Sequence, residues 1–134
     1  MNTAIELHDS AISAVFESGS TVVVRLSPAY VHRSTGRPGI DPGTGWVQEV
    51  ELRFANGVIE CPLTDLPCTL GDGFVTGGIE FRNAVPLPLS VESEVRFEAR
   101  TVHGERLVVR GSGLDVSPVT DAKYVEEFPG HPAT

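Results

Sequence analysis

The side chains most capable of chemistry gather in one stretch, PAYVHRSTGRPGIDPGTGW, which runs from Pro28 to Trp46. Its candidate binding residues are Tyr30, His32, Arg33, Arg37, Asp41 and Trp46. Arginine presents a planar fork of donors that suits carboxylates and phosphates, and a glycine-rich backbone leaves N–H groups accessible to an anion. We therefore expect this stretch to bind a small anionic ligand or a neighbouring subunit.

The composition of the same stretch indicates a long loop. Residues 28–46 hold four glycines and three prolines, and strand-like sequence flanks them on both sides. Long loops inside a compact domain are uncommon and often carry binding sites. The stretch lacks the GxxxxGK(S/T) pattern of a phosphate-binding loop. A purely structural interpretation stays open, in which Arg33 or Arg37 pairs with Asp41 and the glycines and prolines only set turns.

Other polar clusters give weaker signals. His8, Asp9 and Ser10 are adjacent, whereas catalytic triads assemble from separated positions, so we interpret these three as a turn. The four histidines lack HxH or HExxH spacing, and there is no CxxC pair. Cys61 and Cys68 are expected to be reduced thiols. The sequence therefore predicts no catalytic constellation, no metal site and no cofactor.

The acidic balance of the chain argues against two classes of partner. Its 134 residues carry 18 acidic and 10 basic side chains, for a net charge of −8. Nonspecific nucleic-acid binding and attachment to anionic membranes both depend on clustered Lys and Arg. No apolar run approaches the roughly 20 residues of a membrane span, and no secretory signal is recognisable. We expect a cytoplasmic protein that contacts neither nucleic acid nor membrane.

Alternation of apolar and polar residues predicts strands along most of the chain. Residues 21–27, 46–54 and 91–100 each place apolar side chains on one face and polar or charged side chains on the other, with few exceptions. In particular, Trp46 shares a face with Phe54. This pattern is typical of half-buried antiparallel strands, each with one face against a core and one in water.

A single all-β domain is expected over residues 1–134. Many short strands separated by turn signals predict an antiparallel β-sandwich or a small barrel of about 7–9 strands. The chain is long enough to bury a core without a disulfide or a metal ion. Residues 121–128 are a candidate short C-terminal helix, which Asp121 would cap and Pro129-Gly130 would end.

One hairpin can be registered from Asn56-Gly57, the favoured pair for a two-residue type I′ turn. With this turn, apolar residues pair with apolar residues across the hairpin, and acidic residues pair with basic residues. It pairs Leu52 with Cys61 on the core side, so we interpret Cys61 as a small buried hydrophobe.

A second hairpin is marked by His103-Gly104. A two-residue loop would mix the apolar and charged faces, because a slip of one residue exchanges inside and outside. A three-residue loop from His103 to Glu105 sets Ala99 against Val109 and keeps the faces consistent. We therefore predict a three-residue loop with a bulge.

The N-terminal third resembles a small family of uncharacterised bacterial proteins. The resemblance lies in LHDS at 7–10, VVVRL at 22–26 and SPAYVHRSTGRPGIDPGTGWVQ at 27–48. It implies that the LHDS segment and the PAYVHRSTGRPG-type loop are family signatures. It carries no activity, ligand or catalytic residue to this chain.

Three functions stay open, and binding ranks first because no catalytic motif is found. A non-enzymatic binding or assembly domain would use residues 28–46 for an anionic ligand or a homo-oligomer contact, since Tyr, Trp and Arg are enriched at interfaces. A small-barrel enzyme acting on an acidic metabolite would use His32 as acid or base, because only histidine titrates near neutrality unperturbed. A structural scaffold domain would use the stretch as a clip.

Overall fold

The computed structural model describes residues 1–131 and is built almost entirely from strands. Its elements are β1 (Asn2–Glu6), the 3-10 turn η1 (Leu7–Asp9), β2 (Ala11–Ser18), β3 (Thr21–Ser34), β4 (Gly43–Ala55), β5 (Val58–Cys61), β6 (Cys68–Gly77), β7 (Phe81–Arg82), β8 (Ala84–Pro86), β9 (Leu89–Val91), β10 (Val95–Thr101), β11 (Arg106–Gly111), β12 (Gly113–Pro118) and β13 (Lys123–Phe128). The all-β prediction is confirmed, although thirteen strands exceed the 7–9 expected. None of the described helical turns is long and apolar enough to cross a membrane.

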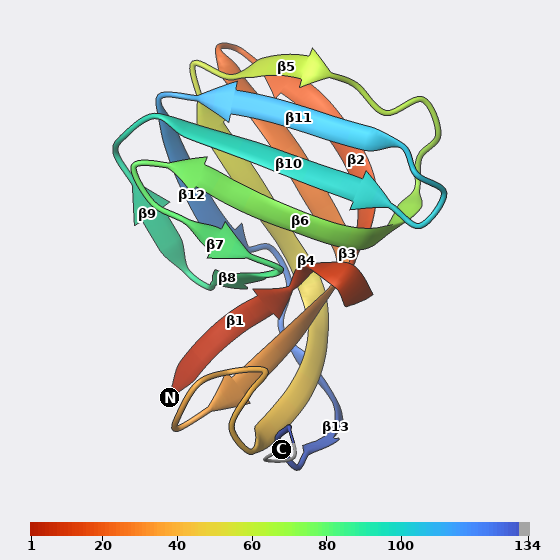
Figure 1. Ribbon diagram of the computed structural model, residues 1–134, viewed down its shortest axis with the longest axis vertical. Coiled ribbons are helices and arrows are strands. Elements are labelled where there is room, and N and C mark those ends of the chain that lie inside the picture. The colour runs from red at the N-terminus through yellow and green to blue at the C-terminus, as the bar shows by residue number, and fades with distance from the viewer. Residues whose placement is uncertain (132–134) are drawn as a thin grey trace.

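The strands form one antiparallel sheet that folds back on itself (Figure 1). Along the main path the order is β5-β11-β10-β6-β2-β3-β4-β12-β9, and β2 joins the two halves by pairing briefly with β6. Apolar side chains from both halves meet in a shared core. Phe54 of β4 and Phe97 of β10, both fully buried, lie with their ring centroids 5.9 Å apart.

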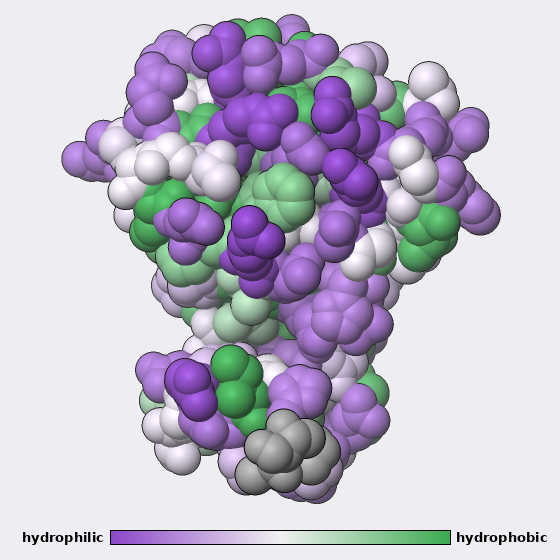
Figure 2. Space-filling view, viewed as in Figure 1, coloured by the Kyte–Doolittle hydropathy of each residue, from purple (hydrophilic) through white to green (hydrophobic). Residues whose placement is uncertain are grey.

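The β3–β4 hairpin runs the length of the molecule and divides it into a body and an extension (Figure 1). In the body, β2 and β12 cover the outer edges of the hairpin. In the extension, which comprises β1, residues 29–34, residues 43–48 and β13, the first and last strands cover the same two edges. Figure 2 shows the narrowing between the two parts.

A β-bulge separates the two halves of β3. Leu26 pairs with Val50 and Ala29 pairs with Gln48, so β3 has one more residue than β4 between these pairs. The extra residue inverts the alternation of β3 relative to its partner. Odd-numbered residues of β3 therefore share the face of Trp46 in the extension, whereas even-numbered residues share the face of Phe54 in the body.

The long loop predicted over residues 28–46 is wrong, because most of this stretch is strand. β3 continues to Ser34 and β4 begins at Gly43, which leaves only residues 35–42 between them. A Cβ atom on Gly43 would lie 1.9 Å from the carbonyl oxygen of Arg33. This glycine therefore allows two strands to approach closely rather than setting a turn.

The Asn56-Gly57 turn is present, but the predicted hairpin is wrong. Asn56 adopts a φ of 48°, as a tight turn requires. Both edges of β4 are already occupied, by β3 on one side and β12 on the other, so β5 pairs with β11 in the other half of the sheet. Cys61 consequently lies opposite Val108, and not opposite Leu52, and is half-buried.

The β10–β11 hairpin has the predicted three-residue loop, displaced by one residue along the chain. Thr101 N–H donates to the carbonyl oxygen of Glu105, so the loop comprises residues 102–104. Ala99 pairs with Leu107 instead of Val109. The displacement changes the register by two residues, which keeps every side chain on its predicted face.

The predicted C-terminal helix is wrong. Residues 123–128 form β13, which pairs with the distal part of β4 from Val47 to Gly43. An unpaired strand edge offers backbone partners to a passing segment. This pairing overrides a short local helical pattern, because intrinsic propensity is a weak prior compared with tertiary context.

Ion pairs cross the strands on the outer face of the body. The carboxylate of Glu51 is almost fully buried and accepts hydrogen bonds of 2.6 Å from Nη2 of Arg25 and Nη2 of Arg53. The hydrogen bond from Arg25 is the main reason that the pKa of Glu51 is lowered, against the opposing effect of burial. Glu51 is therefore held in its charged form.

The substitution Glu51→Gln should reduce the amount by which the free energy of unfolding falls in acid. Because the folded protein holds the Glu51 proton less tightly than the unfolded chain, this residue stabilises the fold fully above the unfolded pKa of 4.5. The contribution disappears as the pH falls through the lowered pKa. Urea denaturation from about pH 7 to pH 2 should show a shallower fall for the variant. Glu49→Gln, two residues earlier, is the control, and equal pH profiles for both variants would contradict the assignment.

Candidate functional site

The extension separates the six predicted site residues into three groups. Tyr30 and His32 lie on one face of the distal sheet, and Arg33 and Trp46 lie on the other, because successive residues of a strand point to opposite faces. Arg37 and Asp41 lie in the loop at the tip. The structure therefore does not bring the six residues together as one site.

Arg37 and Asp41, the two predicted site residues at the tip, contact each other. Asp41 Oδ2 accepts a hydrogen bond of 2.7 Å from the backbone N–H of Arg37 and lies 3.7 Å from the guanidinium Nε of the same residue. The Arg37 side chain is 74% exposed. This is one of the two pairings that the structural interpretation of the stretch expects.

The second face carries an arginine stacked on the only tryptophan of the chain. The guanidinium carbon of Arg33 lies 4.2 Å from the centroid of Trp46. Tyr124 of β13 packs edge-on against the same indole, with centroids 5.5 Å apart, and is 52% exposed. Trp46 rests on the hydrophobic core, so the three side chains form a firm surface, which we call the Arg33–Trp46–Tyr124 face.

The face that carries Tyr30 and His32 holds an open depression of about 520 Å³. It is lined by Glu6, Asp9, Tyr30, His32, Glu126, Phe128 and His131. The lining residues come from β1, η1, β3, β13 and the segment after β13. Three carboxylates and two histidines face this depression, with no lysine or arginine among the described lining residues, so its character is acidic.

His32 is the most enclosed polar residue of the depression. It is 7% exposed and packs against the rings of Tyr30 and Phe128, with centroid distances of 5.0 and 4.7 Å. Nε2 contacts the Oε2 atom of Glu6, and Nδ1 has no partner among the described residues. Because a carboxylate only accepts hydrogen bonds, we assign Nε2 of His32 as the donor in this contact.

Tyr30 closes the side of the depression next to β13. A Cβ atom on Gly45 would lie 2.1 Å from the Tyr30 hydroxyl, so the ring lies directly over this glycine. The hydroxyl donates a hydrogen bond of 2.5 Å to Oε1 of Glu126. Burial, this hydrogen bond and the nearby charges of Glu126, Glu6 and Asp9 all raise the pKa of Tyr30 far above its ordinary value.

The turn expected at residues 8–10 is confirmed, and its hydrogen bonds fix the backbone beside the depression. Ser10 Oγ donates to the carbonyl oxygen of Glu6 at 2.8 Å and accepts the N–H of Tyr30 at 3.0 Å. His8 Nε2 lies 2.8 Å from Oε1 of Glu6 and 3.4 Å from Oδ2 of Asp9. Ser10 therefore serves the backbone, and the three residues form no triad.

Sequence reasoning missed the side chains that complete both faces. Glu126 reaches Tyr30 across 96 residues of sequence, and Tyr124 reaches Trp46 from the same C-terminal strand. No local pattern links such distant positions. A usable signal existed only for Glu6, which stands two residues before His8 and three before Asp9.

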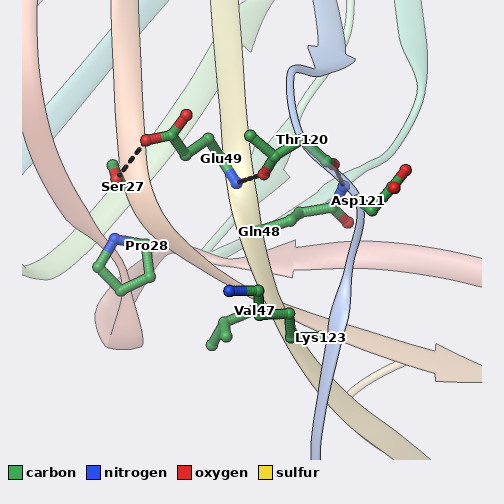
Figure 3. Close-up of a pocket in the computed structure, with 8 residues that line it drawn as sticks. All are labelled: Ser27, Pro28, Val47, Gln48, Glu49, Thr120, Asp121 and Lys123. Carbon is green, nitrogen blue, oxygen red and sulfur yellow. Dashed lines mark hydrogen bonds between the residues drawn. The ribbon is translucent and has the colours of Figure 1, made fainter.

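A further depression, of about 440 Å³, marks the junction of body and extension (Figure 3). Glu49 N–H donates to Thr120 Oγ1 at 2.9 Å, and Gln48 Nε2 donates to the Thr120 carbonyl oxygen at 3.0 Å. Ser27 Oγ donates to Oε1 of Glu49 at 3.0 Å. These contacts hold the segment between β12 and β13 against β4 next to the bulge. We therefore assign the junction a structural role.

The two cysteines are free and lie outside both faces of the extension. Burial raises the pKa of the Cys68 thiol, and the charge of Glu105 adds to this effect. A raised pKa lowers the thiolate fraction and therefore the reactivity of the sulfur.

No protein-family model, curated protein or solved structure is matched by this chain. The function therefore has to be argued from the two faces of the extension. One face offers an arginine on an aromatic platform, and the other offers an acidic, histidine-containing depression.

The raised pKa of Tyr30 can be measured directly, because Tyr124→Phe leaves it as the only tyrosine. Absorbance at the tyrosinate wavelength should show Tyr30 still protonated at about pH 10, where an unperturbed tyrosine is half ionised. The folded state then binds more protons than the unfolded state, so the free energy of unfolding should fall as the pH rises above 10.

The matched variant is Glu126→Gln in the same Tyr124→Phe background. It removes the charge but keeps an acceptor oxygen, so the titration of Tyr30 should move part of the way back toward the unfolded value. Ionisation of Tyr30 with an ordinary pKa in the folded protein would contradict the contacts described.

Proposed function

We propose that this protein is a non-enzymatic binding or assembly domain that associates with a second copy of itself through the Arg33–Trp46–Tyr124 face. A single observation carries the proposal. Eight of the nine arginines have a carboxylate within 4.0 Å, and Arg33 is the exception among the described residues. Its guanidinium stacks on Trp46, and its hydrogen-bond donors are not paired with a carboxylate in the part of the chain that the structure describes.

The chemistry of the face supports a protein partner. Tryptophan, tyrosine and arginine dominate the binding energy of protein interfaces, and they do so best on a rigid platform. Arg33 is half-buried, and Trp46 is fixed by the core and by a hydrogen bond of 2.7 Å from its Nε1 to Thr44 Oγ1. The face therefore loses little side-chain entropy on binding.

Carboxylates on a second copy are suitable partners for Arg33. Each copy carries 18 acidic side chains, and a local pair with Arg33 has to outweigh the repulsion between two copies of net charge −8. Arginine and carboxylate form a bidentate, charge-assisted pair that gains strength where water is excluded. A small carboxylate or phosphate ligand would use the same donors of Arg33 and is the second candidate occupant.

The geometry favours binding over the enzymatic alternative. An enzyme for an acidic metabolite needs a cation next to its acid or base, and the depression around His32 is lined by carboxylates instead. An anionic substrate would be repelled there. Arg33 lies on the opposite face of the strand, and Arg37 is paired at the tip, so neither holds an anion beside His32.

Arg33→Ala should weaken self-association at least tenfold, which corresponds to about 1.4 kcal/mol. Sedimentation equilibrium over a hundredfold range of protein concentration measures the dissociation constant. Arg33→Lys should recover only part of the affinity, because lysine keeps the charge but loses the planar fork and the stacking. The control is Arg82→Ala, which removes an exposed arginine that pairs with Glu80.

Two results would overturn the proposal. The wild-type protein could stay monomeric at every concentration, which alone would exclude self-association; if Arg33→Ala also left binding of a small carboxylate or phosphate probe unchanged, the second candidate occupant would be excluded as well. Alternatively, Arg33→Ala and Arg82→Ala could lower the affinity equally, which would attribute the effect to net charge alone.

A further inference from the structure

The geometry points to a divalent transition-metal site at Glu6, His8 and Asp9, in which His32 positions Glu6. Glu6 and Asp9 line the acidic depression, and His8 lines the neighbouring hollow beside Glu6. The inference is independent of the Arg33–Trp46–Tyr124 face on the other side of the strands. The three proposed ligands come from the end of β1 and from η1.

The donor atoms already lie at ligand spacing. One donor atom from each of Glu6, His8 and Asp9 lies within 4.8 Å of the other two. The closest pairs are His8 Nε2 with Glu6 Oε1 at 2.8 Å and His8 Nε2 with Asp9 Oδ2 at 3.4 Å. Metal–ligand bonds of about 2.0–2.2 Å place neighbouring ligand atoms roughly 3–3.5 Å apart. Small side-chain rotations therefore suffice to bind one ion.

The backbone fixes this spacing. The single 3-10 turn at Leu7–Asp9 directly follows Glu6 and carries His8 and Asp9, whose donor atoms lie close to that of Glu6. Leu7 is fully buried and anchors the turn in the core. Ser10 closes the turn through its N–H to the carbonyl oxygen of Leu7 at 3.0 Å and through its Oγ to the carbonyl oxygen of Glu6 at 2.8 Å.

His32 supplies the second, independent observation. It is more than nine-tenths buried, it lines the depression, and its Nδ1 is a polar atom without a partner among the described residues. Buried polar atoms are almost always paired in native proteins, and an exception calls for a bound ion, a water or a functional reason. An apolar side chain would fill this position at lower cost, so packing alone does not account for a histidine here.

The other ring nitrogen of His32, Nε2, contacts Glu6 and connects this histidine to the proposed ligands. His32 Nε2 donates to Oε2 of Glu6, which holds the carboxylate in one orientation and leaves Oε1 directed to His8. Hydrogen bonds from outer residues to metal ligands commonly change affinity by about 10–100-fold. We therefore assign His32 as a positioning residue and not as a ligand.

The local charge favours a cation. Glu6, Asp9 and Glu126 face the depression, and none of them has a lysine or arginine nitrogen within 4.0 Å in the part of the chain that the structure describes. Arg82 lines the neighbouring hollow but pairs with Glu80 instead. By contrast, the buried carboxylates of the body are each compensated by at least two arginines.

The ligand set selects among cations. One imidazole nitrogen and two carboxylates suit Zn²⁺ and similar transition ions, whereas Mg²⁺ and Ca²⁺ prefer six or more oxygen ligands. The His8 and Asp9 side chains are about half exposed, at 45% and 54%, so water can complete the coordination shell. Glu126 and His131 also line the depression and are left out of the proposed shell.

The test uses the full-length protein, first treated with a chelator and then freed of it. Isothermal titration with ZnCl₂ should show one equivalent bound, and MgCl₂ should not compete at equal concentration. His8→Ala should weaken Zn²⁺ binding at least tenfold, and its exposed position should leave the thermal unfolding of the metal-free protein unchanged. His103→Ala is the control, because it removes another exposed histidine, in the loop of residues 102–104, that is not one of the proposed ligands.

Rescue separates the positioning role of His32 from a structural one. His32→Gln retains an N–H donor near the position of Nε2 and should keep Zn²⁺ affinity within a few-fold of wild type. His32→Leu keeps the packing volume but lacks the donor, and it should lose about 10–100-fold in affinity. Visible absorption of the Co²⁺-substituted protein provides a readout of ligand geometry that a change in stability alone does not move.

Absence of Zn²⁺ and Co²⁺ binding by the wild-type protein would overturn the site. Equal affinity in His8→Ala and wild type would also overturn it, and it would indicate adventitious binding elsewhere. Equal loss in His32→Gln and His32→Leu would overturn the positioning role. Arg33→Ala should leave Zn²⁺ binding intact. The metal site and the proposed assembly face are therefore tested independently of each other.

Discussion

The backbone pairing of β3 with β4 is the constraint on which the rest of the structure depends. One continuous antiparallel ladder, interrupted by a single bulge, spans both the core of the body and the whole extension. Its proximal half needs β2 and β12 at its edges, and its distal half needs β1 and β13. Each edge of the hairpin is thus covered twice: the β3 edge by β2 and β1, and the β4 edge by β12 and β13, which are distant from β4 in sequence.

This arrangement explains how one short sheet presents two chemically different faces. Strand alternation sends Tyr30 and His32 to one side and Arg33 to the other. On the first side Glu6 and Glu126 have no arginine nitrogen within 4.0 Å among the described residues, whereas on the second side Arg33 stacks on Trp46 and Glu127 accepts a hydrogen bond from Tyr124. In the body, by contrast, the buried carboxylates Glu51 and Glu98 are each paired with arginines.

The period-two pattern predicted the strands well wherever one face is buried. The shared face of Trp46 and Phe54 on β4 follows from alternation alone, because β4 contains no bulge. Alternation continued along β3 beyond Leu26 would place Tyr30 and His32 on the side of Phe54, but the bulge shifts the parity and places them on the side opposite Trp46. A bulge depends on local backbone geometry that residue types alone do not specify.

The glycines of the stretch from Pro28 to Trp46 explain why a loop was predicted there. Glycine usually signals a turn, but Gly43 and Gly45 are strand residues against which a carbonyl group and the Tyr30 hydroxyl pack closely. The C-terminal strand was mispredicted for a related reason, because only the distant edge of β4 determines its conformation. Neither effect has a local signal in the sequence.

The acidic depression was only partly predictable. His32 and Tyr30 could be chosen from their chemistry, and their spacing of two residues places them on one face of a strand. Their partners Glu6 and Glu126 lie near opposite ends of the chain. These partners become visible only once β1 and β13 are known to flank the same hairpin.

Amide hydrogen exchange followed by NMR tests the central claim most directly. If the distal hairpin is a paired sheet, hydrogen-bonded amides of residues 29–34 and 43–48 should exchange slowly, as those of the body do. Residues 35–42 at the tip provide the fast-exchanging reference within the same molecule. Exchange of residues 29–34 and 43–48 at the rate of the tip would show that this stretch is an open loop, and both proposed faces would lose their support.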